Sequence, residues 1–132
     1  MPLEHHRDPR RGWFIVRVAE RLDIDETIQL IRTLRSNVAD RMVPMIVDAR
    51  EARGRIADQD IERAVAAVRE AVSVGGPRGH VAIAADDDGL YASMLRYEAA
   101  CADIGVQVIR VFRHLPDAEQ WLEIISATRD FR

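Results

Sequence analysis

Residues 13–18 read Trp-Phe-Ile-Val-Arg-Val, and residues 43–48 read Val-Pro-Met-Ile-Val-Asp. Both runs are rich in β-branched and aromatic side chains, which is typical of strands. Between them, Asp23 with Glu26 three residues later resembles a capping box that opens an amphipathic helix. A strand–helix–strand unit of this length indicates parallel strands joined by a right-handed crossover. The stretch from Trp13 to Asp48 therefore decides the fold class.

The same alternation continues along the chain. The pattern predicts a polar loop over 48–57, a helix capped by Asp58, a buried strand at His80–Ala85, a helix at Leu90–Ile104 ended by Gly105, a strand at Val106–Phe112 and a final helix from Pro116. A short strand at residues 2–6 would form a hairpin with residues 13–18 and add an antiparallel edge strand. We therefore expect an α/β fold with a mostly parallel sheet.

Composition limits the class of protein. A chain of 132 residues predicts one domain, with an N-terminal strand and turn over 1–12, the α/β domain over 13–127 and a frayed tail over 128–132. The net charge of −3 does not favour a nucleic-acid partner, and no apolar run is long enough to span a membrane. The N-terminus lacks the apolar core of a signal peptide, and the single cysteine fits a reducing compartment, so we expect a cytoplasmic protein.

All 19 basic residues are arginine, and the chain contains no lysine. The absence of lysine excludes a Walker A phosphate loop and Schiff-base chemistry, and it disfavours a phosphoacceptor receiver domain. No serine lies in a Gly-x-Ser-x-Gly elbow. Adjacent His5 and His6 would face opposite sides of a strand, and Cys101 falls on the inner face of its helix. We therefore expect no enzyme activity and no cofactor.

The order of these residues resembles the STAS domain of anti-sigma-factor antagonists, over most of residues 13–122. The resemblance rests on Phe14-Ile-Val-Arg-Val, Leu22-Asp23, Thr27, Leu34-Arg35, Ile46-Val47-Asp48 and the final stretch from Gly105 to Leu122, which is similar to the stand-alone SpoIIAA-like branch. It implies a single STAS-like domain whose sheet order is 1-3-2-4-5, with helices on both faces. The known members bind partner proteins, and the branch is often compared with CRAL-TRIO lipid-binding domains.

One family feature is missing from this chain. In the sporulation antagonists an Asp-Ser-Ser sequence begins the helix after the third strand, and phosphorylation there switches partner binding. Here the matching residues are 56–60, Ile-Ala-Asp-Gln-Asp, and no Ser or Thr occurs between Asp48 and Val72. A phosphoserine switch at that site is therefore chemically impossible.

Acidic residues follow the third buried strand. Residues 86–88 are all aspartate, and carboxylates at a strand end can hold Mg²⁺. A helix cap at Asp88, with the other two solvating the loop, is the simpler interpretation. We therefore expect no metal site.

Two binding hypotheses follow, together with an enzyme as the least favoured class. The first is a protein-binding or regulatory module whose partner contacts Arg50, Arg53, Arg55, Asp58 and Gln59. The second is a carrier of a small apolar or phosphorylated ligand, held in a crevice where the strand order reverses and lined by Glu20, Arg21, Asp86, Asp87, Leu90 and Tyr91. The partner is expected to be another protein, and a homodimer through the edge strand or a helix face stays open.

Overall fold

Four helices and a five-stranded sheet make up the described part of the chain, residues 3–35, 42–75, 79–105 and 108–130 of a computed structural model. In chain order the elements are β1 (Leu3–Arg7), β2 (Phe14–Glu20), α1 (Ile24–Arg35), β3 (Met45–Ala52), α2 (Asp58–Gly75), β4 (Val81–Ala84), α3 (Asp88–Ile104), β5 (Ile109–Phe112) and α4 (Leu115–Asp130). The predicted α/β class and the N-terminal strand are confirmed.

The strands lie in the sheet in their sequence order, β1-β2-β3-β4-β5. Strand β1 pairs antiparallel with β2, and the following strands pair in parallel. The predicted order 1-3-2-4-5 is therefore wrong. Each crossover from β2 to β5 advances by one strand in the same direction, so right-handedness places the three crossover helices on one face of the sheet.

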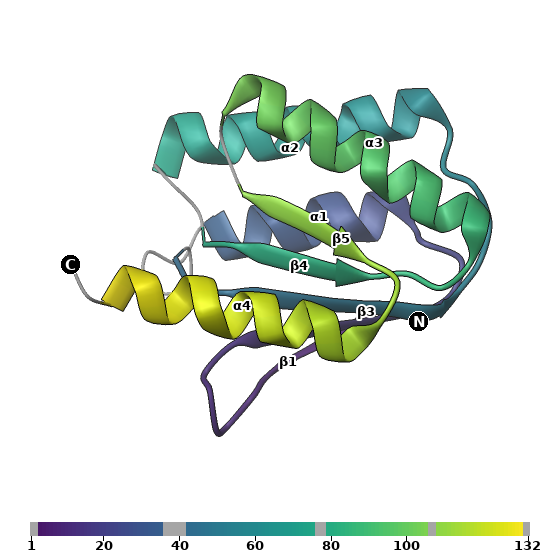
Figure 1. Ribbon diagram of the computed structural model, residues 1–132. Coiled ribbons are helices and arrows are strands. Elements are labelled where there is room, and N and C mark those ends of the chain that lie inside the picture. Colours follow the sequence, from purple (N-terminus) through teal and green to yellow (C-terminus); the bar gives the residue numbers. More distant parts are fainter. Residues whose placement is uncertain (1–2, 36–41, 76–78, 106–107, 131–132) are drawn as a thin grey trace.

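The helices form two unequal layers. Helices α1, α2 and α3 cover one face of the sheet, and α4 lies alone on the other, as Figure 1 shows. The prediction of helices on both faces is confirmed. Helix α4 approaches β4 closely because the contact is made by small side chains, Ala82, Ala84 and Ala118, all fully buried. The three-helix layer packs through larger aliphatic residues such as Val16, Ile31 and Val68.

Helix boundaries test the predicted caps. The Asp23 carboxylate accepts a hydrogen bond from the Glu26 backbone N–H at 3.1 Å, so Asp23 caps α1 as predicted. Helix α2 begins at Asp58, which leaves Ala57 in the capping position, so that predicted cap is wrong. The cap of α3 is Asp87 and not Asp88, since the Asp87 carboxylate accepts from the Leu90 N–H at 3.0 Å. Gly105 ends α3 with φ of 64°, as predicted.

Strand β3 is longer than its apolar run. It continues to Ala52 because β2 pairs with it as far as Glu20, across a bulge between Arg17 and Ala19. The predicted loop over 48–57 is therefore wrong in its first half, and Arg50 belongs to a strand. Strand β5 begins at Ile109, and the predicted strand residues 106–107 lie outside the described residues. Helix α4 continues through 128–130, beyond the predicted start of the tail.

Arg11 ties the β1–β2 hairpin to α4. Its guanidinium pairs with Asp8 at 2.8 Å and with Glu119 and Glu123 at 3.2 Å each, and it stacks over the Trp13 ring. The side-chain hydrogen bond from Arg11 lowers the pKa of Asp8 below its usual value.

None of the described helices has the length and apolar character that a bilayer crossing requires.

Candidate functional site

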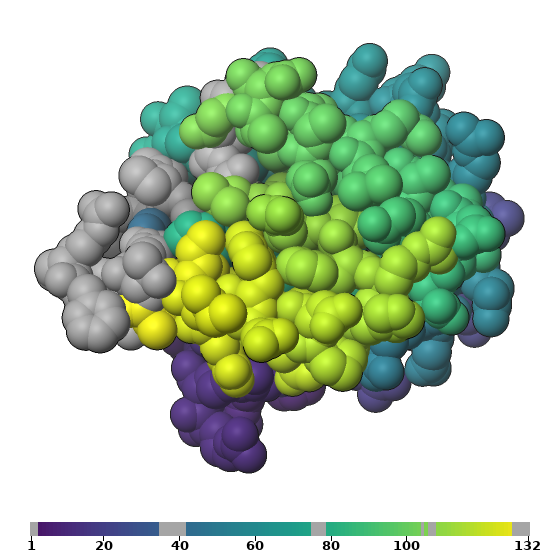
Figure 2. Space-filling model, in the orientation of Figure 1, coloured from purple at the N-terminus to yellow at the C-terminus, as the bar shows by residue number. Residues whose placement is uncertain are grey.

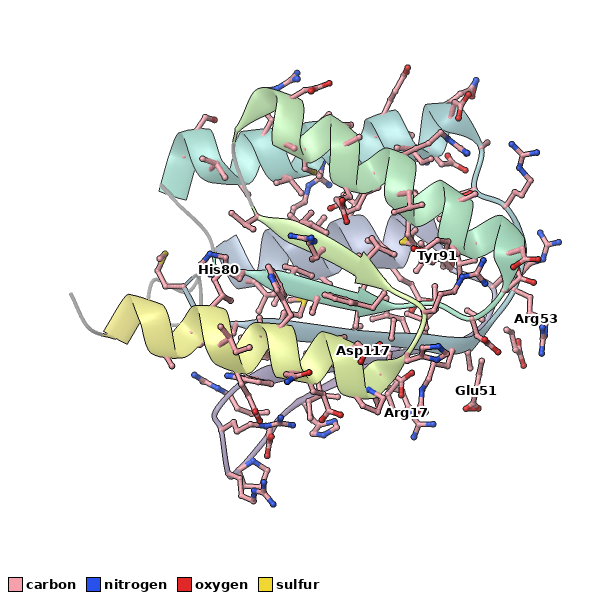
Figure 3. The ribbon with its side chains drawn as sticks, in the orientation of Figure 1. Arg17, Glu51, Arg53, His80, Tyr91 and Asp117 are labelled. Atoms are coloured by element: carbon pink, nitrogen blue, oxygen red, sulfur yellow. The ribbon has the colours of Figure 1, made fainter. Side chains whose placement is uncertain are left out.

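The carboxyl-terminal ends of the parallel strands, with the loops that follow them, form one edge of the molecule. We call this surface the loop edge, and it comprises residues 19–23, 51–57, 85–87 and 113–114. In a parallel sheet all these strand ends meet at one edge, where function is most often found in open α/β folds. Figure 3 shows Glu51 and Arg53 at this edge, with His80 at the opposite end of the strands.

An open depression of about 880 Å³ occupies the β2 and β3 side of the loop edge. It is lined by Ala19, Glu20, Arg21, Asp23, Glu51, Arg53 and Gly54. The lining therefore includes three residues with carboxylates and two with guanidinium groups. The two loops that build the depression are joined by the Arg53 N–H, which donates to the Glu20 carbonyl at 2.7 Å.

Two backbone features shape this depression. Glu20 has φ of 62°, which is uncommon outside glycine, and Gly54 has φ of 101°, a conformation that L side chains rarely adopt. The Arg21 guanidinium lies over Gly54, since a Cβ built on that glycine would sit 3.6 Å from Arg21 Nη2. Gly54 therefore lets the β3–α2 loop turn beneath the Arg21 side chain.

Asp87 connects the third loop of the edge to the second. Its Oδ2 accepts hydrogen bonds from the Gly54 N–H at 3.1 Å and from the Leu90 N–H at 3.0 Å. These backbone donors, that of Gly54 first, lower the pKa of Asp87 below its usual value. The carboxylate is therefore held as an anion that fixes two loops, and its main role is in positioning them.

The predicted partner-binding residues divide into three groups. Arg50 lies in β3, and its guanidinium binds the Asp48 carboxylate through two hydrogen bonds, at 2.8 and 2.9 Å. Arg53 lines the depression with its side chain 74% exposed. Arg55, Asp58 and Gln59 are exposed outside the depression, and Asp58 pairs with Arg96 of α3 at 3.1 Å. The structure therefore does not gather these five residues around one point.

Glu20 and Arg21, from the predicted ligand crevice, share the depression with Arg53. A crevice at a strand-order reversal does not form, because consecutive strand order leaves no reversal among β2–β5. Leu90 is 1% exposed and belongs to the core, so placing it in a crevice wall was wrong.

Asp86 and Tyr91 lie against the next arginine along the loop edge. The Asp86 carbonyl accepts from Arg113 at 2.8 Å, and the same guanidinium stacks 4.2 Å above the Tyr91 ring. It also pairs with the exposed Asp88 carboxylate at 2.8 Å. Arg113 therefore links the Asp86 backbone, the Asp88 carboxylate and the Tyr91 ring on this side of the loop edge.

The interior offers little space for a cargo. An apolar cavity of about 90 Å³ lies between α1 and the sheet. Its floor includes Val16, Val47 and Ile83, and its walls include Ile31 and Tyr97. Small-molecule sites usually measure several hundred Å³, so this volume is well below that of a ligand carrier.

Sequence reasoning missed Ser93, the one polar residue buried among the described residues. Its hydroxyl accepts from the Ile56 N–H at 2.9 Å and donates to the Gly89 carbonyl at 3.0 Å. It thereby fixes the end of the β3–α2 loop against α3. Its position on the same helical face as Leu90 and Met94 was the available signal.

Other ionisable groups remain dispersed. Within the described residues, no three His, Cys, Asp or Glu side chains lie close enough together to hold a metal ion. Cys101 is fully buried, and burial raises its pKa to about 11.

No family model matches the chain, and no curated protein matches it in sequence.

Proposed function

We propose that the protein is a small docking module that binds another protein through the loop edge. The observation that carries this proposal is the open depression bounded by Glu20, Arg21, Glu51 and Arg53. Charged side chains of both signs are presented there by two loops that hydrogen bonds hold in place. A rigid surface with mixed charge suits a partner that offers complementary charges, and such charges set specificity and association rate.

The charge balance favours a protein over a phosphorylated small molecule. The depression contributes the carboxylates of Glu20, Asp23 and Glu51 against the guanidinium groups of Arg21 and Arg53. The Glu51 carboxylate is already paired with Arg17 at 3.3 Å, and carboxylates stand among the two guanidinium groups, whereas phosphate sites normally gather cations or backbone N–H groups. A protein surface can place an arginine against each carboxylate and a carboxylate against each guanidinium.

The small interior cavity also favours docking of a protein partner over carriage of an apolar ligand. A cavity of about 90 Å³ is smaller than the roughly 150 Å³ engineered cavity that admits a single benzene ring. The resemblance to anti-sigma-factor antagonists agrees with docking, because those proteins act by binding partners. The docking that we propose involves no phosphoserine switch at residues 56–60.

The test is charge reversal at the depression. The double variant Arg21→Glu/Arg53→Glu changes two exposed side chains, and the control Arg32→Glu/Arg69→Glu makes the same charge change on α1 and α2. Each protein is expressed with an affinity tag in its native host, and the co-purifying polypeptides are quantified. The purified partner is then titrated against each variant by calorimetry.

We expect one polypeptide to be retained by the wild type and by the control, and to bind the Arg21/Arg53 variant at least tenfold more weakly. Equal loss in both variants would point to a general charge effect and contradict the assignment of the site. Retention of a small molecule in place of a polypeptide, seen by native mass spectrometry, would favour the carrier.

A further inference from the structure

Strand β5 forms an open edge of the sheet, with α3 above and α4 below it in Figure 1. The Val108 carbonyl accepts from the N–H of Val81 in β4, and the Phe112 carbonyl accepts from the N–H of Ala85, which directly follows β4. Backbone polar groups alternate in direction along a strand, so the N–H and C=O of Val111 point away from β4. Outward groups of this kind are a template on which another strand can add.

The outward N–H of Val111 is occupied from within the chain. The Glu98 Oε1 accepts its hydrogen bond at 2.7 Å, a short distance that suits a carboxylate acceptor. Glu98 lies on α3, so its side chain reaches from the helix layer to the edge of the sheet. A second strand cannot use this donor while the carboxylate remains in place.

Exposed apolar side chains lie on the two helices that flank β5 and directly before the strand itself. Leu95 precedes Glu98 by one helical turn, Val108 directly precedes β5, and Ile124 follows Trp121, whose ring packs on Phe112, by one turn. Their exposed fractions are 39, 49 and 60%. They account for three of the four exposed large apolar side chains among the described residues. Figure 2 shows β5 lying at the surface between the two helices.

We propose that Glu98 prevents strand addition at the β5 edge by occupying the Val111 N–H. When the carboxylate is removed, this edge becomes a homodimer surface. A two-fold axis at Val111 would place β5 antiparallel to its copy, with each Val111 donating to and accepting from the other. The apolar side chains Leu95, Val108 and Ile124 would then flank the joined strands on both copies. This inference is independent of the loop edge, which lies at the ends of the strands.

A second copy fits this edge better through β5 than through β1. The opposite edge, β1, consists of Leu-Glu-His-His-Arg, whose last four side chains are exposed. Charged residues on an edge strand discourage pairing. Head-to-tail association, in which β5 of one copy pairs with β1 of the next, is therefore disfavoured. Pairing of β5 with its own copy closes after two chains and brings apolar groups together.

Sedimentation equilibrium and hydrogen exchange test the proposal. We expect the wild type to be monomeric with a protected Val111 amide, and Glu98→Ala to dimerise in a concentration-dependent way. Glu98→Gln keeps an acceptor oxygen and should stay monomeric. Leu95→Glu added to Glu98→Ala places a charge beside the strand and should restore the monomer without altering the backbone.

The proposal is overturned if folded Glu98→Ala keeps the monomer mass, or if the wild type already dimerises through β5. Circular dichroism checks the fold of each variant. Should the alanine variant fail to fold, Glu98→Asp provides the same test, because its shorter side chain cannot reach Val111. An unchanged exchange rate at that amide in Glu98→Asp would equally reject the role of Glu98.

Discussion

Asp87 Oδ2 accepts a hydrogen bond from the backbone N–H of Gly54 at 3.1 Å, across 33 residues of sequence. The same oxygen accepts from Leu90 at 3.0 Å and so caps α3. One carboxylate therefore fixes two adjacent loops of the loop edge. The geometry of the depression depends on this contact, because Gly54 supports the loop that carries Arg53.

Replacing Asp87 should loosen the loop edge. We expect Asp87→Ala to lower the melting temperature by several degrees, since both the helix cap and the link to Gly54 are lost. Asn retains a capping oxygen, so Asp87→Asn should melt close to the wild type at neutral pH. Thermal denaturation followed by circular dichroism measures the difference. Equal melting of the alanine variant and the wild type would refute the role of Asp87.

Acid should weaken the protein through the same residue. The backbone donors hold the folded pKa of Asp87 below its usual value, so the stabilisation is complete above the unfolded pKa of about 4. It is lost as pH falls below that value toward the folded pKa. Urea unfolding at a series of pH values should show a steeper acid decline for the wild type than for Asp87→Asn. Parallel curves would show that Asp87 does not contribute.

The buried hydroxyl of Ser93 provides a stability prediction. Ser93→Ala leaves the buried N–H of Ile56 without its acceptor, which should cost about 1–3 kcal/mol of unfolding free energy. Ser73→Ala is the matched control, because that exposed hydroxyl bonds only to a carbonyl of its own helix, and its change should be near zero. Urea denaturation measures both. A loss no larger than that of the control would contradict this role.

Close backbone packing at Gly79 should make that position intolerant of any side chain. A Cβ there would lie 2.5 Å from the Val43 carbonyl oxygen and 2.6 Å from that of Met42. We expect Gly79→Ala to reduce the unfolding free energy by about 3 kcal/mol or to abolish folding. Gly12→Ala meets no atom within 4 Å and should lose less, through its φ of 73° alone. Soluble yield and thermal melts compare the two variants.

The thiol of Cys101 should be inert in the folded state. It is fully buried, and burial raises its pKa to about 11, so little thiolate is present at neutral pH. A thiol reagent that forms a coloured product should react only as the protein unfolds. Rapid labelling without denaturant would show that the α3 core opens locally.

The sequence by itself determined which segments become strands and helices. Alternation of apolar runs and helical faces predicted the α/β class, and Asp23 and Gly105 were found because caps are local features. The same logic erred by one residue at Asp88 and ended β3 too early, since pairing with β2 extends that strand past its apolar run. For the candidate site, Glu20 and Arg21 were predicted together in a ligand crevice, whereas Arg53 was assigned to a separate partner-binding surface.

Tertiary structure alone decided which of these segments meet. The consecutive strand order removed the expected crevice and brought Glu20 and Arg21 beside Arg53. The contacts of Asp87 with Gly54 and of Glu98 with Val111 join residues that no local pattern relates. Periodicity and capping reflect interactions within one helical turn or one strand. Which strands become neighbours in the sheet depends on the direction of each crossover, and a short stretch of sequence does not encode that direction.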